Sequence, residues 1–201
     1  GPGSMLTKPS HNKFLSCASR LIVLSGVSAF ILLLGLASPA KAAVTETQVA
    51  VATATNLKAI GKPPISPARE LKTGVGVFFS EKVSTNQVGR AQLLFEDGTA
   101  LTVGPTSDLV IDEYVYDPKA GTGAMTVSIS KGFFRLVGGK ISKKTPIKFL
   151  APNATVGVRG GIVLLELGED GALTADLLFG DELTVTSGGK TQRTTQAGRF
   201  I

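Results

Sequence analysis

From about residue 75 onward, short runs of alternating apolar and polar residues dominate the chain. Gly, Pro, Asn and Asp separate these runs, and no stretch of a dozen residues carries the 3.6-residue period of a capped helix. Strands are expected at residues 76–79, 90–95, 99–103, 109–116, 125–129, 132–137, 147–150, 154–161, 162–167, 173–179 and 183–186. The intervening Glu96-Asp97-Gly98 is typical of a hairpin turn. The pattern therefore predicts an all-β domain.

The single Gly and Gly-Gly steps between the strands favour one β-solenoid or β-helix-like domain over residues 73–201, with the glycines at its corners. A β-sandwich or a barrel fits the same strand count, because no repeat of fixed period is visible. The end of a solenoid leaves backbone groups unpaired, so the domain is expected to self-associate or to bind a partner through a strand edge. Proline at Thr184 or Thr186 is expected to block that edge.

The segment before this domain has three parts. Residues 1–4 precede the first Met and are interpreted as a cloning scar, and residues 5–42 as a signal peptide with cleavage after Ala42. An uncleaved anchor is the alternative, since the apolar run 21–37 is almost long enough to span a bilayer. Both place the remainder in the periplasm or at the cell surface. Residues 43–72 are rich in Pro, Ala and Thr and are predicted to be a linker with one early strand near 49–52.

Composition excludes several kinds of chemistry once residues 1–42 are set aside. The whole chain has 21 basic and 15 acidic residues, but the leader carries four of the basic ones, so the exported part has a net charge of only +2. A nucleic-acid-binding function therefore loses its main support. The leader also contains the only Cys and the only His, which excludes disulfides, thiol or Ser-His-Asp catalysis and ordinary transition-metal sites. No cofactor is expected.

Three segments, in this order, resemble the FecR-type periplasmic domain family. They are Leu93–Pro118 with its Asp-Gly-Thr turn, Ser128–Ile141 with Lys-Gly-Phe-Phe-Arg and Gly-Gly-Lys, and Thr145–Leu167 with Gly-Val-Arg-Gly-Gly. The resemblance implies an extracytoplasmic β-rich domain without catalytic activity. The best-known members of this family are inner-membrane regulators that sense an outer-membrane ferric-siderophore transporter and control an extracytoplasmic-function sigma factor. Only Met5–Arg20 precede the apolar run, too few residues for the cytoplasmic anti-sigma segment of those members, so a direct anti-sigma role is not expected.

Arg159, in Val-Arg-Gly-Gly, is the candidate site residue. The favoured interpretation is structural: the glycines turn a tight corner and Arg159 pairs with a carboxylate that holds it. The alternative is that Arg159 contacts a partner from a glycine-flanked loop.

Two acidic groups are candidates for other chemistry. Asp108, Asp112, Glu113 and Asp117 could offer oxygens to Ca²⁺, but their spacing matches no EF-hand, and a solvated strand is favoured. Glu166, Glu169 and Asp170 could form the carboxylate pair of a glycosidase. That enzyme would need an aromatic cleft, and the chain has no Trp and only two Tyr, so a plain turn is favoured and no enzyme is predicted.

A small basic patch comprises Lys140, Lys143, Lys144 and Lys148. The favoured interpretation is a surface loop whose lysines oppose edge-to-edge aggregation, and the alternative is an anionic polymer or lipid headgroup as ligand.

The sequence as a whole predicts an exported, non-enzymatic interaction or scaffold module of the cell envelope. The expected partner is another envelope protein or a second copy of the chain. Nucleic acid is not expected, and a membrane contact is expected only if the leader is uncleaved. The alternatives are a carbohydrate- or cell-wall-binding module and the extracytoplasmic sensor part of a signalling system that regulates a sigma factor.

Overall fold

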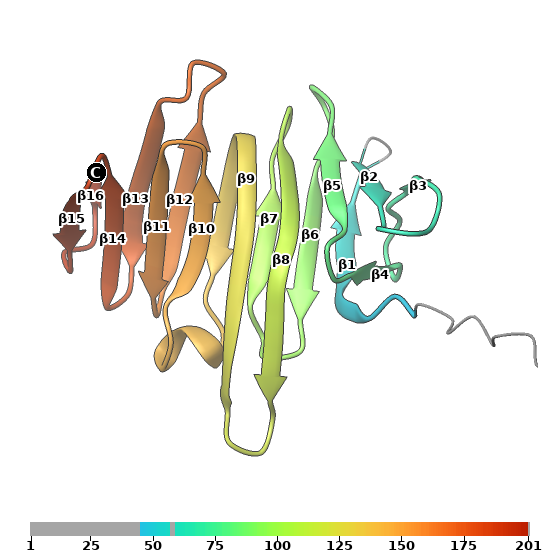
Figure 1. Ribbon diagram of the computed structural model, residues 1–201, viewed down its shortest axis with the longest axis horizontal. Coiled ribbons are helices and arrows are strands. Elements are labelled where there is room, and N and C mark those ends of the chain that lie inside the picture. Colours follow the sequence, from blue (N-terminus) through green and yellow to red (C-terminus); the bar gives the residue numbers. More distant parts are fainter. Residues whose placement is uncertain (1–44, 57–58, 201) are drawn as a thin grey trace, which may run out of the picture. The chain divides into compact units, whose positions relative to one another are not determined.

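The computed structural model describes residues 45–56 and 59–200, which form an all-β unit with one short 3₁₀ turn (Figure 1). The elements are β1 (Gln48–Thr55), β2 (Ala59–Lys62), β3 (Arg69–Glu70), β4 (Gly76–Phe78), β5 (Lys82–Thr85), β6 (Ala91–Phe95), β7 (Ala100–Val103), β8 (Asp108–Asp117), β9 (Thr122–Val137), η1 (Ile141–Lys143), β10 (Ile147–Ala151), β11 (Ala154–Arg159), β12 (Ile162–Leu167), β13 (Leu173–Phe179), β14 (Glu182–Ser187), β15 (Lys190–Thr194) and β16 (Arg199–Phe200). The predicted all-β class is confirmed.

The strands form two sheets that share β9. Sheet I has the order β4-β1-β6-β7-β9-β12-β13-β16. Sheet II has the order β3-β2-β5-β8-β9-β10-β11-β14-β15. The inward side chains of both sheets, among them Phe95, Phe134 and Phe149, belong to one buried core. Apart from β4 and β3 at the ends, the order of strands therefore follows the chain along both sheets.

The long strand β9 passes from one sheet to the other at Gly132. Residues 122–131 pair with β8 in sheet II, and residues 132–137 pair with β12 in sheet I. Gly132 has a φ of 110°, and a Cβ atom there would lie 2.0 Å from the Oγ of Ser107. The same buried Ser107 Oγ accepts a hydrogen bond of 2.9 Å from the N–H of Phe133. Only glycine therefore fits at the point of transfer.

The predicted β-solenoid is not confirmed. Stacked coils of a β-helix pair in parallel, whereas in the described residues β9 and β10 form the one parallel pair and the other pairs are antiparallel. The glycine steps that suggested coil corners are instead turns between antiparallel neighbours and, at Gly132, the transfer between sheets.

The predicted linker over residues 43–72 is wrong for most of its length, because β1, β2 and β3 belong to the folded unit. β1 is a central strand of sheet I, paired with both β4 and β6. Its inward residues are small, and Ala50 and Ala52 are buried, as are Ala59 and Leu71 farther along. Alanine and threonine give a weak alternation of hydropathy, which is why the pattern did not predict this part of the core. The early strand expected near 49–52 is present within β1.

The predicted signal peptide and its predicted cleavage site lie outside the described residues. Within residues 45–56 and 59–200, no helix has the length and hydropathy needed to span a bilayer.

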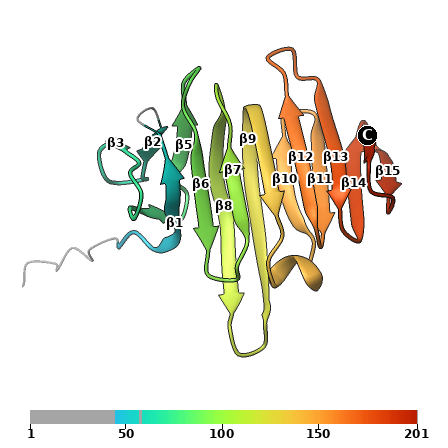
Figure 2. The ribbon, with the colours of Figure 1, turned by 180° about the vertical axis from the view of Figure 1, so that it is seen from behind.

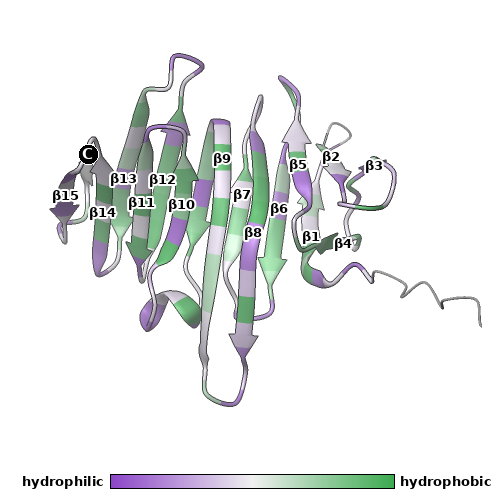
Figure 3. Cartoon of the chain, viewed as in Figure 1, coloured by the Kyte–Doolittle hydropathy of each residue, from purple (hydrophilic) through white to green (hydrophobic). Residues whose placement is uncertain are grey.

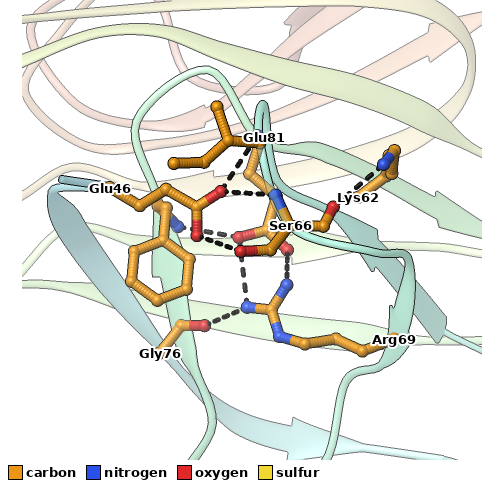
Figure 4. Close-up of polar contacts among 8 residues, drawn as sticks. Glu46, Lys62, Ser66, Arg69, Gly76 and Glu81 are labelled. Atoms are coloured by element: carbon orange, nitrogen blue, oxygen red, sulfur yellow. Dashed lines mark hydrogen bonds and ion pairs between the residues drawn. The ribbon is translucent and has the colours of Figure 1, made fainter. Parts of the chain in front are cut away.

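The amino-terminal edge of sheet I is closed by an ion pair (Figure 4). Arg69 Nη1 lies 2.6 Å from Oε1 of Glu81, whose side chain is fully buried. Gly76 and Phe78 of the edge strand β4 direct their backbone groups away from β1. Arg69 Nη2 donates to the carbonyl of Gly76 (2.6 Å), and the N–H of Phe78 donates to Glu81 Oε2 (2.8 Å). Two side chains thus satisfy backbone groups that another strand would otherwise pair.

Glu46 extends this network to the loop before β3. Its carboxylate accepts hydrogen bonds from the N–H groups of Ile65 (3.0 Å) and Ser66 (2.9 Å) and from the hydroxyl of Ser66 (2.8 Å). Desolvation opposes ionisation, but these bonds and the nearby charge of Arg69 outweigh it and lower the pKa of Glu46 below its ordinary value. The loop that contains the prolines is thereby fastened to the sheet.

Replacing Gly132 by alanine is expected to destabilise the unit by more than about 3 kcal/mol, because the new Cβ overlaps Ser107 and the residue must also keep a positive φ. Gly188→Ala is the matched control: Gly188 also has a positive φ, but nothing lies within 4 Å of its Cβ position, so a loss of about 1 kcal/mol is expected. Urea unfolding measures both values. Equal losses would mean that β9 does not depend on the close approach at Gly132.

Candidate functional site

The three segments that carry the family resemblance meet at one end of the unit. Residues 97–99 form the β6–β7 turn, residues 138–144 follow β9 and include η1, and residues 159–161 connect β11 to β12. Backbone hydrogen bonds join them: Lys140 N–H to Asp97 O (2.9 Å), Gly138 N–H to Gly161 O (2.8 Å) and Gly160 N–H to Ser142 O (2.9 Å). We call these three segments the motif corner.

Asp97 is the centre of the motif corner. Its side chain is buried, with the residue only 2% exposed. Oδ1 accepts the N–H of Thr99 (3.0 Å), while Oδ2 accepts the Thr99 hydroxyl (2.7 Å) and the N–H of Ile141 (3.1 Å). Thr99 Oγ1 in turn accepts the N–H of Gly139 (3.0 Å). A single buried carboxylate therefore holds the turn and the start of η1 together.

Tyr114 of β8 covers this carboxylate from the other sheet. Its hydroxyl accepts the N–H of Asp97 (3.0 Å) and lies 3.4 Å from Asp97 Oδ1, and its ring lies 5.1 Å from that of Phe95. Burial, together with the negative charges of Asp97 and Glu96, raises the pKa of Tyr114 well above its ordinary value. The phenol stays neutral and acts as a structural hydrogen-bonding group.

Glycines allow the backbones of the motif corner to approach one another. A Cβ atom on Gly139 would lie 2.4 Å from the N of Thr99, and one on Gly161 would lie 1.9 Å from the carbonyl oxygen of Phe179. Gly161 also has a φ of 101°. The Gly-Gly pairs of the two later motifs thus serve close packing.

The hydrogen bonds of the motif corner join its three segments to one another. The Asp97 carboxylate is fully engaged by hydrogen-bond donors, which leaves no lone pair directed at a substrate. In the part of the chain that the structure describes, no three His, Cys, Asp or Glu side chains lie close enough to hold a metal ion. What the corner presents to solvent is positive charge, from Lys140, Lys143, Lys144 and Arg159.

Arg159 does not make the ion pair that the structural interpretation expected. It ends β11 with its side chain exposed, opposite Glu182 of β14. Glu182 is paired with Arg193 of β15 at 2.5 Å, and no carboxylate among the described residues pairs with Arg159. The corner is held instead by Gly160, Gly161 and their backbone bonds, which leaves the guanidinium available.

The acidic residues of β8 are not gathered into one site. Asp108 lies 3.8 Å from Lys82, Glu113 accepts a hydrogen bond from the Thr126 hydroxyl, and Asp117 accepts N–H groups of the following turn. A β-bulge between Ile111 and Glu113 makes Asp112 the extra residue. Its buried Oδ2 has no hydrogen-bond partner within the described residues.

The other two candidate groups also separate. Glu166 is exposed on β12, whereas Glu169 and Asp170 lie in the β12–β13 turn, where Asp170 accepts the N–H of Ala172 (3.0 Å). This is the turn that the sequence favoured. Three lysines of the patch lie in the connection expected from the sequence: Lys143 is in η1, and Lys140 and Lys144 flank it. Lys148 is on β10, between β9 and β11, so the patch does not protect a sheet edge.

Sequence reasoning missed the Arg69–Glu81 pair. Arg69 stood within the supposed linker, and neither residue belongs to a recognisable motif. The available signal was a glutamate directly before residues 82–85, which form β5 but were not predicted as a strand, and exposed glutamates in such positions are common.

Comparison with protein families gives one decisive match. The model of the FecR protein family matches residues 81–181, which is 101 of the 201 residues and includes all three segments of the motif corner. The chain belongs to the FecR family. The resemblance seen in the sequence is therefore confirmed, and the FecR match begins at Glu81, the buried partner of Arg69.

Among solved structures, two crystal structures of a candidate anti-sigma factor from Parabacteroides distasonis ATCC 8503 are similar to this FecR chain. At 2.50 Å resolution the TM-score is 0.46 with 17% identity, and at 1.65 Å it is 0.47 with 14% identity. Each comparison covers 60% of this chain and 53% of the other, so this chain spans about half the length of those proteins. A search of curated proteins gives no match.

Replacing Asp97 by asparagine is expected to cost about 1–3 kcal/mol, because the new amide must face N–H or O–H donors with one of its own N–H groups. Asp170→Asn is the control, since an exposed turn residue that accepts one N–H can keep its bond as asparagine. Thermal and urea unfolding compare the two. A loss for Asp97→Asn no greater than for the control would contradict the central role of this carboxylate.

Proposed function

We propose that this FecR domain is the extracytoplasmic, protein-binding part of a signalling system that controls a sigma factor, and that it has no catalytic role. Membership of the FecR family supports the regulatory part of this proposal. One structural observation supports protein binding: sheet II ends in a strand with an unpaired edge. This proposal is more specific than the function predicted from the sequence, which was an interaction or scaffold module of the cell envelope.

β15 is that edge strand. Within the described residues it pairs with β14 alone, through a hairpin whose two turn residues are Gly188 and Gly189. In a two-residue hairpin the closing pair is hydrogen-bonded, here Ser187 and Lys190, so the backbone groups of Thr191 and Arg193 point away from β14. The strand is exposed and hydrophilic along its length (Figure 3). A strand from a partner protein could add to this edge.

The opposite ends of the two sheets do not offer an equivalent surface. The edge of β4 is capped by Arg69 and Glu81, and β3 is only two residues long. Thr184 and Thr186, expected from the sequence to lie on the free edge, belong to β14 and pair with β11. The docking edge is therefore β15, one strand farther along.

Arg159 is proposed as a second contact with the same partner. It lies on the exposed face of sheet II, two strands from β15, and its charge is not neutralised by a carboxylate in the described residues. A strand added to β15 would lie three strand spacings, about 14 Å, from β11. The partner would therefore pair with Arg159 through an acidic segment that extends from this strand over β14.

In the bacterium that encodes the chain, deleting residues 45–200 is expected to change transcription of the genes that one extracytoplasmic-function sigma factor controls. RNA sequencing measures this change. The double substitution Thr191→Pro/Arg193→Pro, which removes two outward N–H groups, should reproduce the deletion, whereas Thr191→Ala/Arg193→Ala keeps those groups and should not. Unaltered transcription in the deletion strain would refute the signalling function.

The edge could alternatively join two copies of this chain. Sedimentation velocity on the same proline variant distinguishes the two partners. If proline converts a dimer into a monomer while transcription is unchanged, the edge serves self-association and the proposed partner contact is wrong.

Arg159→Ala is expected to leave the melting temperature within about 1 °C of the parent, since the exposed side chain has no ion-pair partner to lose. The same variant should weaken the transcriptional response, and Arg159→Lys should restore part of it by restoring the charge. A fall of several degrees would show that the arginine has a structural role instead.

A further inference from the structure

The charge of the exported chain is concentrated in its middle. Between Asp117 and Glu166 the sequence contains eight basic residues and no acidic one: Lys119, Lys131, Arg135, Lys140, Lys143, Lys144, Lys148 and Arg159. The remainder of the chain from Ala43 onward contains nine basic and fifteen acidic residues. The near-neutral total of residues 43–201 therefore conceals a strongly basic region within an otherwise acidic sequence.

Six of these eight side chains surround η1. Lys144 Nζ donates to the carbonyl of Ala120 (2.8 Å), which brings η1 to the β8–β9 turn that contains Lys119. The bond from Gly160 N–H to Ser142 O brings Arg159 to the other side of η1. Lys148 pairs with Gly157 and so lies diagonally across from Arg159 on the same face of sheet II. We call Lys119, Lys140, Lys143, Lys144, Lys148 and Arg159 the basic platform.

The charges of the basic platform are exposed and uncompensated. All six residues are exposed, and none forms an ion pair with another described residue. The acidic side chains nearby are Asp117, which accepts two N–H groups of its own turn, the exposed Asp181, and the exposed Glu113. Glu113 accepts a hydrogen bond from Thr126, the residue of β9 that pairs with Lys148. Asp97 is buried, and Glu182 is paired with Arg193. Six positive charges thus face few negative ones.

The backbone beneath these charges is fixed. Ile141 and Ser142 of η1 are fully buried, and Asp97 holds the N–H of Ile141. The Ser142 hydroxyl donates to Gly139 O (2.8 Å). A solvated loop that only prevents aggregation would not need such anchoring. The motif corner therefore acts as the base from which the lysines project.

We propose that the basic platform binds the phosphate groups of an anionic lipid surface. Five of its six residues are lysines, which act as point charges toward phosphate. The β8–β9 hairpin extends beyond the other strands at this end (Figure 2) and carries Val115, which is 62% exposed and can enter the interface between headgroups and acyl chains. The platform contains no aromatic side chain on which a base could stack, which disfavours nucleic acid. This inference goes beyond the proposed signalling function and does not depend on it.

The full chain is tested by co-sedimentation with vesicles of phosphatidylcholine alone and vesicles with about 30% phosphatidylglycerol, a typical anionic composition. Lys140→Gln/Lys143→Gln/Lys144→Gln is the platform variant, and Lys62→Gln/Lys72→Gln/Lys190→Gln is the control with the same change in net charge. Each lysine near an anionic surface contributes a factor of about five, so the platform variant should bind the anionic vesicles at least tenfold more weakly. The control should change by less than about threefold, since its lysines lie elsewhere.

The apolar run 21–37 and the basic leader are the same in all three proteins, so they cannot produce a difference between the variants. Equal melting temperatures establish that the substitutions leave the fold intact. Equal losses in both variants, or no preference of the parent for anionic vesicles, would overturn the proposal. A short single-stranded DNA that binds the parent as tightly as the vesicles, with the same loss in the platform variant, would assign the platform to nucleic acid and also overturn it.

Discussion

The transfer of β9 between the two sheets at Gly132 is the constraint on which the rest of the structure depends. Because one strand belongs to both sheets, its two halves fix β8 and β10 on one side and β7 and β12 on the other. β9 ends at Val137. The next two residues are Gly138, whose N–H donates to Gly161, and Gly139, whose N–H donates to the Thr99 hydroxyl. The Lys-Gly-Phe-Phe-Arg and Gly-Gly-Lys motifs therefore act on the same strand. The first contains the glycine at which β9 changes sheet, and the second joins the end of β9 to the motif corner.

The hydrogen bonds around Asp97 both stabilise the fold and fix the position of the lysines that follow β9. Buried polar groups are costly unless they are fully hydrogen-bonded, and Asp97 meets that condition through Thr99, Ile141 and Tyr114. Once satisfied, the network makes the connection between β9 and β10 rigid. That connection carries lysines on its exposed side, so the residues that stabilise the fold also determine where positive charge is displayed.

The sequence was informative wherever burial on one face produced alternation. The hairpin around Asp97 and Gly98, and the strands now named β10 to β14, were predicted because their inward residues are large and aliphatic or aromatic. Only residues 49–52 of β1 were expected to be a strand, and the place of β1 in the core was missed because alanine fills its inward positions. β15 was not predicted because it is an edge strand with no buried side. The sequence could not show whether Arg159 has a carboxylate partner. Glu182 lies between Arg159 of β11 and Arg193 of β15 and pairs with Arg193, and this depends on how the strands are arranged.

The unequal edges of the two sheets also limit how the molecule can assemble. A protein with a long free strand at both ends of a sheet can stack head to tail without limit and form filaments. Here sheet II has a long free edge at β15 but ends at its other side in a strand of two residues, next to the edge that Arg69 and Glu81 cap. Association through β15 can thus add one foreign strand or close a two-fold pair, and growth stops there.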